Sequence, residues 1–320
     1  MGASSHTVTI AHITDAHVAP FGRATATLKH LSLAVFEDLV AQCRERDVDV
    51  VLFGGDNIDN RGHGEADLEA FMDVTSRLDR WFCVPGNHEA PRTGLVSKER
   101  FMRAVEGHGA ENRFGLFSRG FGSVRIIGID TVLTGSPGGY VEPLTLRHLS
   151  EEIRAAEEDH IVVLGHHPLY RAWEPMQMDS WDREYLVANR HEVTALLCSA
   201  PKVRAYLCGH HHASRIQRIG RPHRAGFYHI LTSSPVAYPH YARILHVETD
   251  GIRVEALHPR LVGLPELGRQ AVLTGRKAQR FEQQRHASQA SFLAYLVGSA
   301  LDEAAFLPHD LTSATALFSA

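Results

Sequence analysis

Short apolar runs that end abruptly in polar residues recur five times between residues 7 and 212. They are rich in β-branched and aromatic residues, a composition typical of buried β-strands. The run at residues 50–53 ends in two glycines and Asp56. Because ligands bind where the strands of an open α/β sheet end, this pattern predicts a site built from several strand ends. Asp56 is expected near its centre.

Most of the polar residues at these ends are metal-ligand types, and several are paired. The set comprises Asp15, His17, Asp56, Asn87, His88, His166, His210 and His212. In an extended segment residues i and i+2 face the same side, so Asp15 and His17 can reach one ion. A single Asp-x-His or Gly-Asp is equally compatible with a turn or a helix cap. Five such ends in one chain favour a metal site.

The composition is that of an ordinary globular protein. The chain has 320 residues, 44% of them apolar and 22% charged, and room for one large or two ordinary domains. A net charge of −4 provides no basic field, so nucleic acid is not an expected partner. The four cysteines are scattered, which favours free thiols over disulfides. Because no apolar run approaches membrane-spanning length, we expect a soluble, cytoplasmic protein without a membrane partner.

Periodicity predicts how the runs are connected. Helical spacing over 25–46 links the first two strands in a β-α-β unit, which implies parallel pairing. Residues 113–119 and 123–129 suggest an antiparallel pair, and 169–187 an excursion over the site. The segments 214–219, 227–231, 241–247 and 252–257 are expected as antiparallel strands, mainly in a second sheet. A helix over 279–300 would pack on its own domain or on a second subunit.

Five ordered motifs resemble the calcineurin-like metallophosphoesterase superfamily. They are Asp15-Ala16-His17, Gly55-Asp56, Gly86-Asn87-His88-Glu89, Gly165-His166 and Gly209-His210-His211-His212. The resemblance implies a four-layer α/β-β/α sandwich of two mixed sheets flanked by helices. Since the motifs span residues 15–212, we expect one catalytic domain over residues 1–258. Residues 259–320 would form a partly helical C-terminal extension used for packing or dimerisation.

The same resemblance implies a dinuclear centre. One metal would bind Asp15, His17 and His212, the other Asn87, His166 and His210, with Asp56 bridging them. A metal-bridging hydroxide would attack phosphorus in line, and His88 would stabilise the transition state or protonate the leaving oxygen. Besides Asn87 and His88, Arg61 and His211 are candidate substrate contacts; a packed or solvated histidine is the competing interpretation of His211. Asp59 either orients a histidine or caps the following helix.

The donor set constrains the metals and their charge. Nitrogen and oxygen ligands without cysteine suit two divalent or trivalent ions drawn from Mn, Fe, Zn, Co and Ni. Asp15 and Asp56 supply the only formal negative charges among the seven ligands. Two divalent ions with a bridging hydroxide therefore leave one excess positive charge, which attracts a phosphoester.

The resulting functional prediction is a metal-dependent phosphoric ester hydrolase. Its motif spacing is similar to that of the cyclic-nucleotide and glycerophosphodiester branch, which favours a phosphodiesterase acting on a small-molecule phosphodiester. A phosphomonoesterase or nucleotide pyrophosphatase on the same site is the enzymatic alternative. A non-catalytic scaffold on the same fold is the alternative of another class. The expected partner is a small-molecule phosphoester, and a second copy of the chain in a homo-oligomer is the other partner considered.

Overall fold

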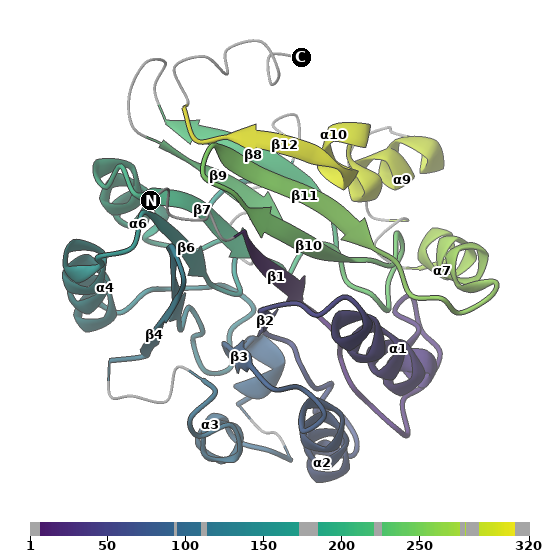
Figure 1. Ribbon diagram of the computed structural model, residues 1–320. Helices are drawn as coiled ribbons and strands as arrows, with labels where there is room; N and C mark the ends of the chain where they lie inside the picture. The colour runs from purple at the N-terminus through teal and green to yellow at the C-terminus, as the bar shows by residue number, and fades with distance from the viewer. Residues whose placement is uncertain are drawn as a thin grey trace.

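The computed structural model describes residues 7–92, 95–109, 114–172, 185–220, 226–275, 279 and 288–310. Two six-stranded sheets face each other at the centre of the molecule, and helices cover their outer faces (Figure 1). The first sheet has the order β12-β11-β10-β1-β2-β3 and the second the order β4-β5-β6-β7-β9-β8. Both mix parallel and antiparallel pairs, so the predicted sandwich of two mixed sheets is confirmed.

The first sheet is built around β1 (Val8–Ile13). Its parallel neighbour β2 (Val50–Phe53) follows helix α1 (Ser32–Glu45), and β3 (Trp81–Cys83) follows helix α2 (Gly64–Thr75). These are β-α-β connections of the kind expected between parallel strands. The other edge of β1 pairs antiparallel with β10 (Ala242–Val247), and β11 (Gly251–Leu257) follows in a hairpin.

The second sheet has a parallel centre, in which β5, β6, β7 and β9 run side by side. Antiparallel strands β4 and β8 close its two edges. Helix α4 (Pro143–Ala155) connects β5 to β6, and α6 (Arg190–Ser199) precedes β7. The strands are β4 (Leu116–Phe121), β5 (Val124–Ile129), β6 (His160–Leu164), β7 (Val203–Cys208), β8 (Arg215–Gly220) and β9 (Gly226–Leu231).

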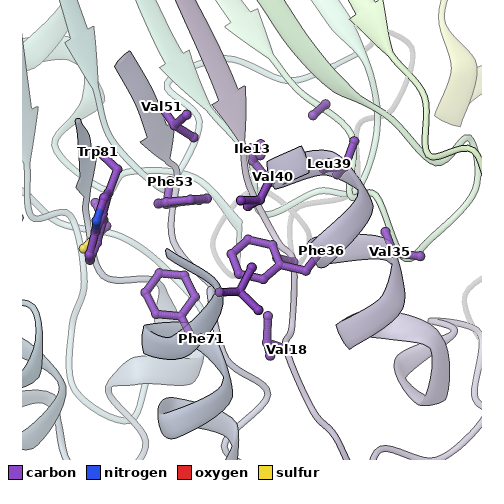
Figure 2. Packing of buried hydrophobic residues seen from close by; sticks show 14 of the residues in the cluster. Ile13, Val18, Val35, Phe36, Leu39, Val40, Val51, Phe53, Phe71 and Trp81 are labelled. Carbon is purple, nitrogen blue, oxygen red and sulfur yellow. The ribbon is translucent and has the colours of Figure 1, made fainter. Parts of the chain in front are cut away.

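Three hydrophobic clusters hold the four layers together. Ile10 and Leu52 of the first sheet meet Val162 and Leu207 of the second between the sheets. Alternate residues on β1 and β2 point outward, where Phe53 packs with side chains of α1 and α2 (Figure 2). The outer face of the second sheet packs in the same way against α4 and α6. Because the central strands are covered on both faces, they are mainly apolar, as the sequence pattern indicated.

In Figure 2 the aromatic rings of this outer layer form a contiguous group. Phe53 from β2 lies 5.5 Å from Phe36 of α1 and 5.4 Å from Phe71 of α2, measured between ring centroids. Phe53 and Phe71 also meet Trp81 of β3 edge-on. Contacts of this kind are worth about 0.5–1.5 kcal/mol each beyond their buried area. They fix the strand that ends at Asp56 against both of its helices.

The placement of β10 and β11 corrects the sequence-based prediction. Residues 241–247 and 252–257 were expected mainly in the second sheet, but they extend the first by pairing with β1. Only residues 215–220 and 226–231 of that antiparallel run join the second sheet. Alternation of apolar and polar residues identifies a strand, whereas the edge that a strand joins depends on which edges are already taken. β2 occupies one edge of β1, so β10 takes the other.

Two predicted helices differ in extent from the observed ones. The helix expected over 25–46 begins at Ser32, after a 3₁₀ turn at Lys29–Leu31, because Leu28 N–H instead donates to the Val236 carbonyl. The helix expected over 279–300 is observed as α9 (Gln289–Val297) and ends at Gly298, whose φ is 75°. Most of 276–287 lies outside the described residues, as does 173–184 of the expected excursion.

The sequence analysis assigned no element to several segments that the structure orders. These segments are α3 (Lys98–Ala104), α7 (Leu264–Leu273), α10 (Ala300–Glu303) and β12 (Ala305–Pro308), with a 3₁₀ turn at Asn87–Glu89. β12 pairs with β11 at the edge of the first sheet. The domain boundary after residue 258 stays a prediction. Across the described residues, no helix is both long enough and apolar enough to cross a membrane.

Candidate metal centre

The predicted ligands occupy tight turns at the ends of β1, β2 and β7. Five of them have a left-handed backbone, with φ of 54° at Asp15, 43° at His17, 49° at Asp56, 72° at His210 and 54° at His212. Asp and His adopt this conformation more readily than most residues, yet it is rare outside glycine. Strained backbone of this kind clusters at functional sites, where the surrounding fold enforces it.

Asp15, His17 and His212 form the first cluster. His212 Nε2 lies 3.1 Å from His17 Nε2 and 3.2 Å from Asp15 Oδ1. The other carboxylate oxygen, Asp15 Oδ2, accepts hydrogen bonds from the Thr14 hydroxyl and from His210 N–H. Although burial opposes ionisation, the hydrogen bond and charge of His212 hold the pKa of Asp15 below its usual range. Burial lowers the pKa of His17 well below 6.5, so its imidazole is neutral and can coordinate a cation.

Asn87, His166 and His210 form the second cluster. His166 Nδ1 lies 2.8 Å from the Gly54 carbonyl oxygen, which can only accept, so Nδ1 carries the proton. Its Nε2 lone pair therefore faces His210 Nδ1 at 3.1 Å and Asn87 Oδ1 at 3.3 Å. A histidine held by a backbone carbonyl on one nitrogen and open on the other is the usual arrangement of a metal ligand.

Asp56 lies between the two clusters. Its Oδ1 is 3.5 Å from His166 Nε2, and its Oδ2 is 3.8 Å from His17 Nε2. The carboxylate is buried, and Oδ1 accepts a hydrogen bond from the backbone N–H of His88. Each oxygen thus faces one cluster, which is the arrangement a bridging carboxylate requires.

His88 stands beside Asp56 with its proton position fixed. His88 Nδ1 lies 2.7 Å from the Asp59 carbonyl oxygen, so Nδ1–H donates and Nε2 is directed toward Asp56 Oδ2, 3.9 Å away. Arg61 Nη2 lies 3.2 Å from the same Nε2. Burial and Arg61 act to lower the pKa of His88, but Asp56 and Asp59 outweigh them and raise it.

Asp59 is placed next to histidines and does not cap a helix. Its Oδ1 lies 3.3 Å from His88 Nδ1 and 3.9 Å from His17 Nδ1, while α2 begins without a side-chain cap. Lys29 forms a largely buried ion pair with the same oxygen. Of the two interpretations of Asp59, the structure supports the orienting one. Sequence reasoning missed Lys29, because a lysine before a helix carries no local signal of this contact.

Glu89 is a second missed residue and joins two of the turns. One carboxylate oxygen accepts from Asp56 N–H at 2.9 Å and Gly86 N–H at 2.6 Å, and the other accepts from Ile58 N–H at 2.9 Å. Burial and the charge of Asp56 raise the pKa of Glu89 to about 7. Glu89 is the last residue of the Gly-Asn-His-Glu motif, so the sequence marked its position. The motif did not indicate that its carboxylate accepts hydrogen bonds from two turns.

Glycines permit the turns to approach one another. A Cβ at Gly86 would lie 2.1 Å from Asp56 N, and one at Gly209 would lie 2.2 Å from Asp15 Oδ2. Such distances do not occur between real atoms, so any side chain there must push the ligand turns apart. The glycines that precede Asn87 and His210 are therefore part of the site geometry.

The neighbouring histidines have other partners. His167 lies 2.8 Å from the Thr131 hydroxyl through Nδ1 and 3.2 Å from the Pro137 carbonyl oxygen through Nε2, so both nitrogens are engaged. His211 is buried, with its ring 5.6 Å from that of Tyr185, and it lines a cavity beside His212. The packed interpretation and the predicted substrate contact of His211 both stay predictions.

The donor set fits metal ions. The unprotonated His166 Nε2 and the two carboxylates bring lone pairs together inside the protein, and such groups repel unless a cation lies among them. Groups of three His and Asp ligand atoms lie within 4.8 Å of one another, and Asp56 belongs to two of these groups. The residues present therefore fit bound metal ions, and Asp56 belongs to the groups on both sides.

A comparison of the sequence with models of known protein families gives a match. The model for calcineurin-like phosphoesterases matches residues 8–214, about two thirds of the chain. The chain therefore belongs to the calcineurin-like phosphoesterase family, as its five motifs predicted.

Two curated relatives are named phosphodiesterases. A probable glycerophosphodiester phosphodiesterase, GpdQ, from Arcobacter nitrofigilis is 26% identical over 51% of this chain; the match spans 56% of the relative, just over half its length. The 3′,5′-cyclic adenosine monophosphate phosphodiesterase CpdA from Vibrio vulnificus is 24% identical over 65% of this chain and 71% of its own. The predicted resemblance to this branch is confirmed.

Solved structures share the fold. A dimetal phosphatase from Danio rerio superposes with a TM-score of 0.59 over 78% of this chain and 95% of its own, at 17% identity. The purple acid phosphatase PPD1 from yellow lupin gives 0.58 over 80% and 52%, at 16% identity. The four-layer architecture is therefore that of metallophosphoesterases.

Proposed function

We propose that the protein is a dinuclear metal-dependent phosphodiesterase acting on a small-molecule phosphodiester. The observation that supports it most is the position of Asp56, whose two carboxylate oxygens face two separate histidine-containing clusters. Two ions held there would supply a hydroxide nucleophile at neutral pH and balance the charge that develops on the phosphoryl oxygens. The ligand set proposed for them is Asp15, His17 and His212 on one side and Asn87, His166 and His210 on the other.

The protein's own groups would bind and orient the ester. His88 Nδ1–H is held by the Asp59 carbonyl, and the protonated ring, which Asp56 and Asp59 favour against burial by raising the pKa of His88, would present Nε2–H to a phosphoryl or leaving oxygen. Arg61, next to His88 Nε2, adds a cation that attracts the monoanionic ester. Asn87 contributes no charge, which keeps the net balance of the loaded site positive.

Two observations favour a diester over a monoester. Two cavities border the centre, one lined by His211 and His212 and the other by Asp59 and Arg61, so there is room for two organic groups on one phosphate. The curated relatives are named for phosphodiester substrates. The phosphomonoesterase alternative has no comparable support. The phosphatases of similar structure share under 25% sequence identity with this chain, so they are evidence for its fold and not for its substrate.

The test is hydrolysis by protein reconstituted with Mn, Fe, Zn, Co or Ni, with bound metal counted by elemental analysis. Bis(4-nitrophenyl) phosphate should be cleaved with a higher kcat/KM than 4-nitrophenyl phosphate. Faster cleavage of the monoester would reject the phosphodiesterase assignment. Two bound metals without any hydrolysis across a phosphoester panel would favour the scaffold.

A variant at the shared ligand provides the matched control. Asp56→Asn keeps the shape of the side chain and suits the left-handed backbone, but it removes one of two formal negative charges. We expect loss of at least one metal and about a thousandfold lower kcat, in protein whose circular dichroism is unchanged. Full activity in this variant would contradict the bridging role.

A further inference from the structure

A cavity of about 390 Å³ adjoins the candidate metal centre on the His212 side. Its wall on this side consists of His211 and His212, and His212 Nε2 is only 3.2 Å from Asp15 Oδ1. A group attached to a phosphate bound at the centre can therefore extend into the cavity without leaving the protein. A cavity of about 150 Å³ already holds a benzene ring, so this one has room for a larger group.

The rest of the cavity wall is mainly apolar and comes from distant parts of the chain. Helices α7 and α9 supply most of it, and two alanines from other segments also line it: the residues are Val272, Phe292, Tyr295, Leu296, Ala26 and Ala237. Phe292, Tyr295 and Leu296 are each at most 6% exposed and belong to the core of the second sheet. Packing against the second sheet, in which His210 follows strand β7, therefore fixes the position of this wall.

The C-terminal segment is attached directly to the turn that carries His212. Ser214 N–H donates to the Leu296 carbonyl at 2.9 Å, and Ile216 N–H donates to Asp302. Arg215 also pairs with Asp302 at 3.1 Å. These bonds place α9 two residues from a proposed ligand. The contacts in the structure pack α9 against its own chain. This packing forms one side of the cavity next to the candidate metal centre.

From these observations we infer that the cavity selects a phosphoester whose organic group is apolar or aromatic, and disfavours a polyol such as glycerol. The inference rests on the proposed function and narrows its substrate class. Burying an apolar ring in this cavity is favourable because it removes apolar surface from water. Burying hydroxyl groups there costs free energy, because few wall atoms can replace their hydrogen bonds to water. Among the described residues, the polar side chains in the wall are three threonines, Tyr238, Tyr295 and the two histidines, and apolar groups line the larger part of it.

Three phosphonates that cannot be hydrolysed at a P–O–C bond test the inference by calorimetry on the metal-loaded protein. Phenylphosphonate, methylphosphonate and 2-hydroxyethylphosphonate share the group that binds metal and differ in the attached arm. We expect phenylphosphonate to bind at least tenfold more tightly than methylphosphonate, with a more negative heat capacity change. 2-Hydroxyethylphosphonate should stay within about threefold of methylphosphonate. Equal Kd values for all three would overturn the inference.

Two variants place the preference in this cavity. Ala26→Asn adds a polar group on a half-buried loop, and Leu296→Ala removes part of the wall; each should reduce the phenyl-to-methyl ratio at least threefold. Leu144→Ala, at an apolar residue lining a different cavity, should leave the ratio unchanged. Thermal unfolding verifies that each variant is folded. Leu296 belongs to the core, so Leu296→Ala can fail to fold; Ala26→Asn lies outside the core and then carries the test alone. An unchanged ratio in a folded Ala26→Asn protein would place the preference elsewhere and overturn the inference.

The two proposals fail separately. Hydrolysis of bis(4-nitrophenyl) phosphate together with equal phosphonate affinities would leave the phosphodiesterase assignment standing and reject the apolar cavity as a specificity site. Absence of hydrolysis would reject the assignment, while the ratio of phosphonate affinities would still decide the role of the cavity. If none of the three phosphonates bound the loaded protein, the inference about the cavity would be overturned, and hydrolysis would still decide the phosphodiesterase assignment.

Discussion

Protonation of a buried histidine should limit the stability of the protein in acid. His229 lies on β9 with its ring fully buried, parallel to Tyr206 and edge-on to Tyr170. Its Nε2 accepts a hydrogen bond from the Leu169 N–H at 3.1 Å, so the proton is on Nδ1. Adding a second proton would break this bond and charge an imidazole in an apolar environment. Burial accordingly lowers the pKa of His229 from 6.5 to about 3.

The magnitude follows from linkage between protonation and folding. In the unfolded chain His229 takes up a proton near pH 6.5, but the folded chain does not until about pH 3. The unfolded state therefore binds more protons between these values, and stability falls as the pH falls. The loss assigned to this residue is about 1 kcal/mol at pH 5.5 and about 3 kcal/mol at pH 4.5, relative to pH 8.

Urea unfolding between pH 4.5 and 8 provides the assay. His229→Gln retains an acceptor for Leu169 N–H and cannot take up the proton, so its free energy of unfolding should fall less steeply with acid, by the amounts above. Tyr170→Phe keeps the neighbouring ring and should retain the parent slope. Parallel pH profiles for parent and His229→Gln would refute the reasoning.

Three further predictions concern the centre itself. His88→Ala should retain both metals by elemental analysis and lose about a hundredfold or more in kcat, because it removes a hydrogen-bonding group and no proposed ligand; loss of metal instead would make His88 a ligand. Gly86→Ala should reduce metal content and activity together, since its Cβ would collide with Asp56 N, whereas Gly62→Ala, which has open space around it, should behave as the parent does; equal activity of both variants would show that the turns can separate. Removing metal with a chelator should lower Tm, because each ion present at a hundred times its Kd adds about 2.7 kcal/mol of stability; an unchanged Tm would argue against ions bound to the folded state.

The metal centre was largely predictable because its residues follow strands. Asp15 and Asp56 follow neighbouring parallel strands of the first sheet, and His166 follows β6 of the second, so each lies at the carboxyl end of a strand. The spacing of motifs also gave the family. Long-range partners were not predictable in this way: Lys29 reaches Asp59 from thirty positions away, and Glu89 joins two turns through backbone N–H groups that leave no mark in a sequence.

The fold shows the same division between local and distant information. Strand periodicity located β10 and β11, but the prediction assigned them to the wrong sheet. Which strand pairs with β1 depends on which of its edges is still unpaired, and the local sequence does not contain that information. The helix containing Phe292 and Leu296 was predicted from its spacing, but its packing beside His212 was not. Residues after 259 have no motif, so their contribution to the site required the three-dimensional contacts.

The left-handed turns at Asp15, Asp56 and His210 have a thermodynamic consequence for the metal-free protein. Each costs of order 1–3 kcal/mol, which the remainder of the fold must offset before any ion binds. Because the ligand turns already have this conformation, metal binding needs little reorganisation of the backbone, and ions should bind quickly. Glycine at such a position would relax the main chain while abolishing the ligand. A more heat-resistant apoprotein can thus arise from the same substitution that removes its chemistry.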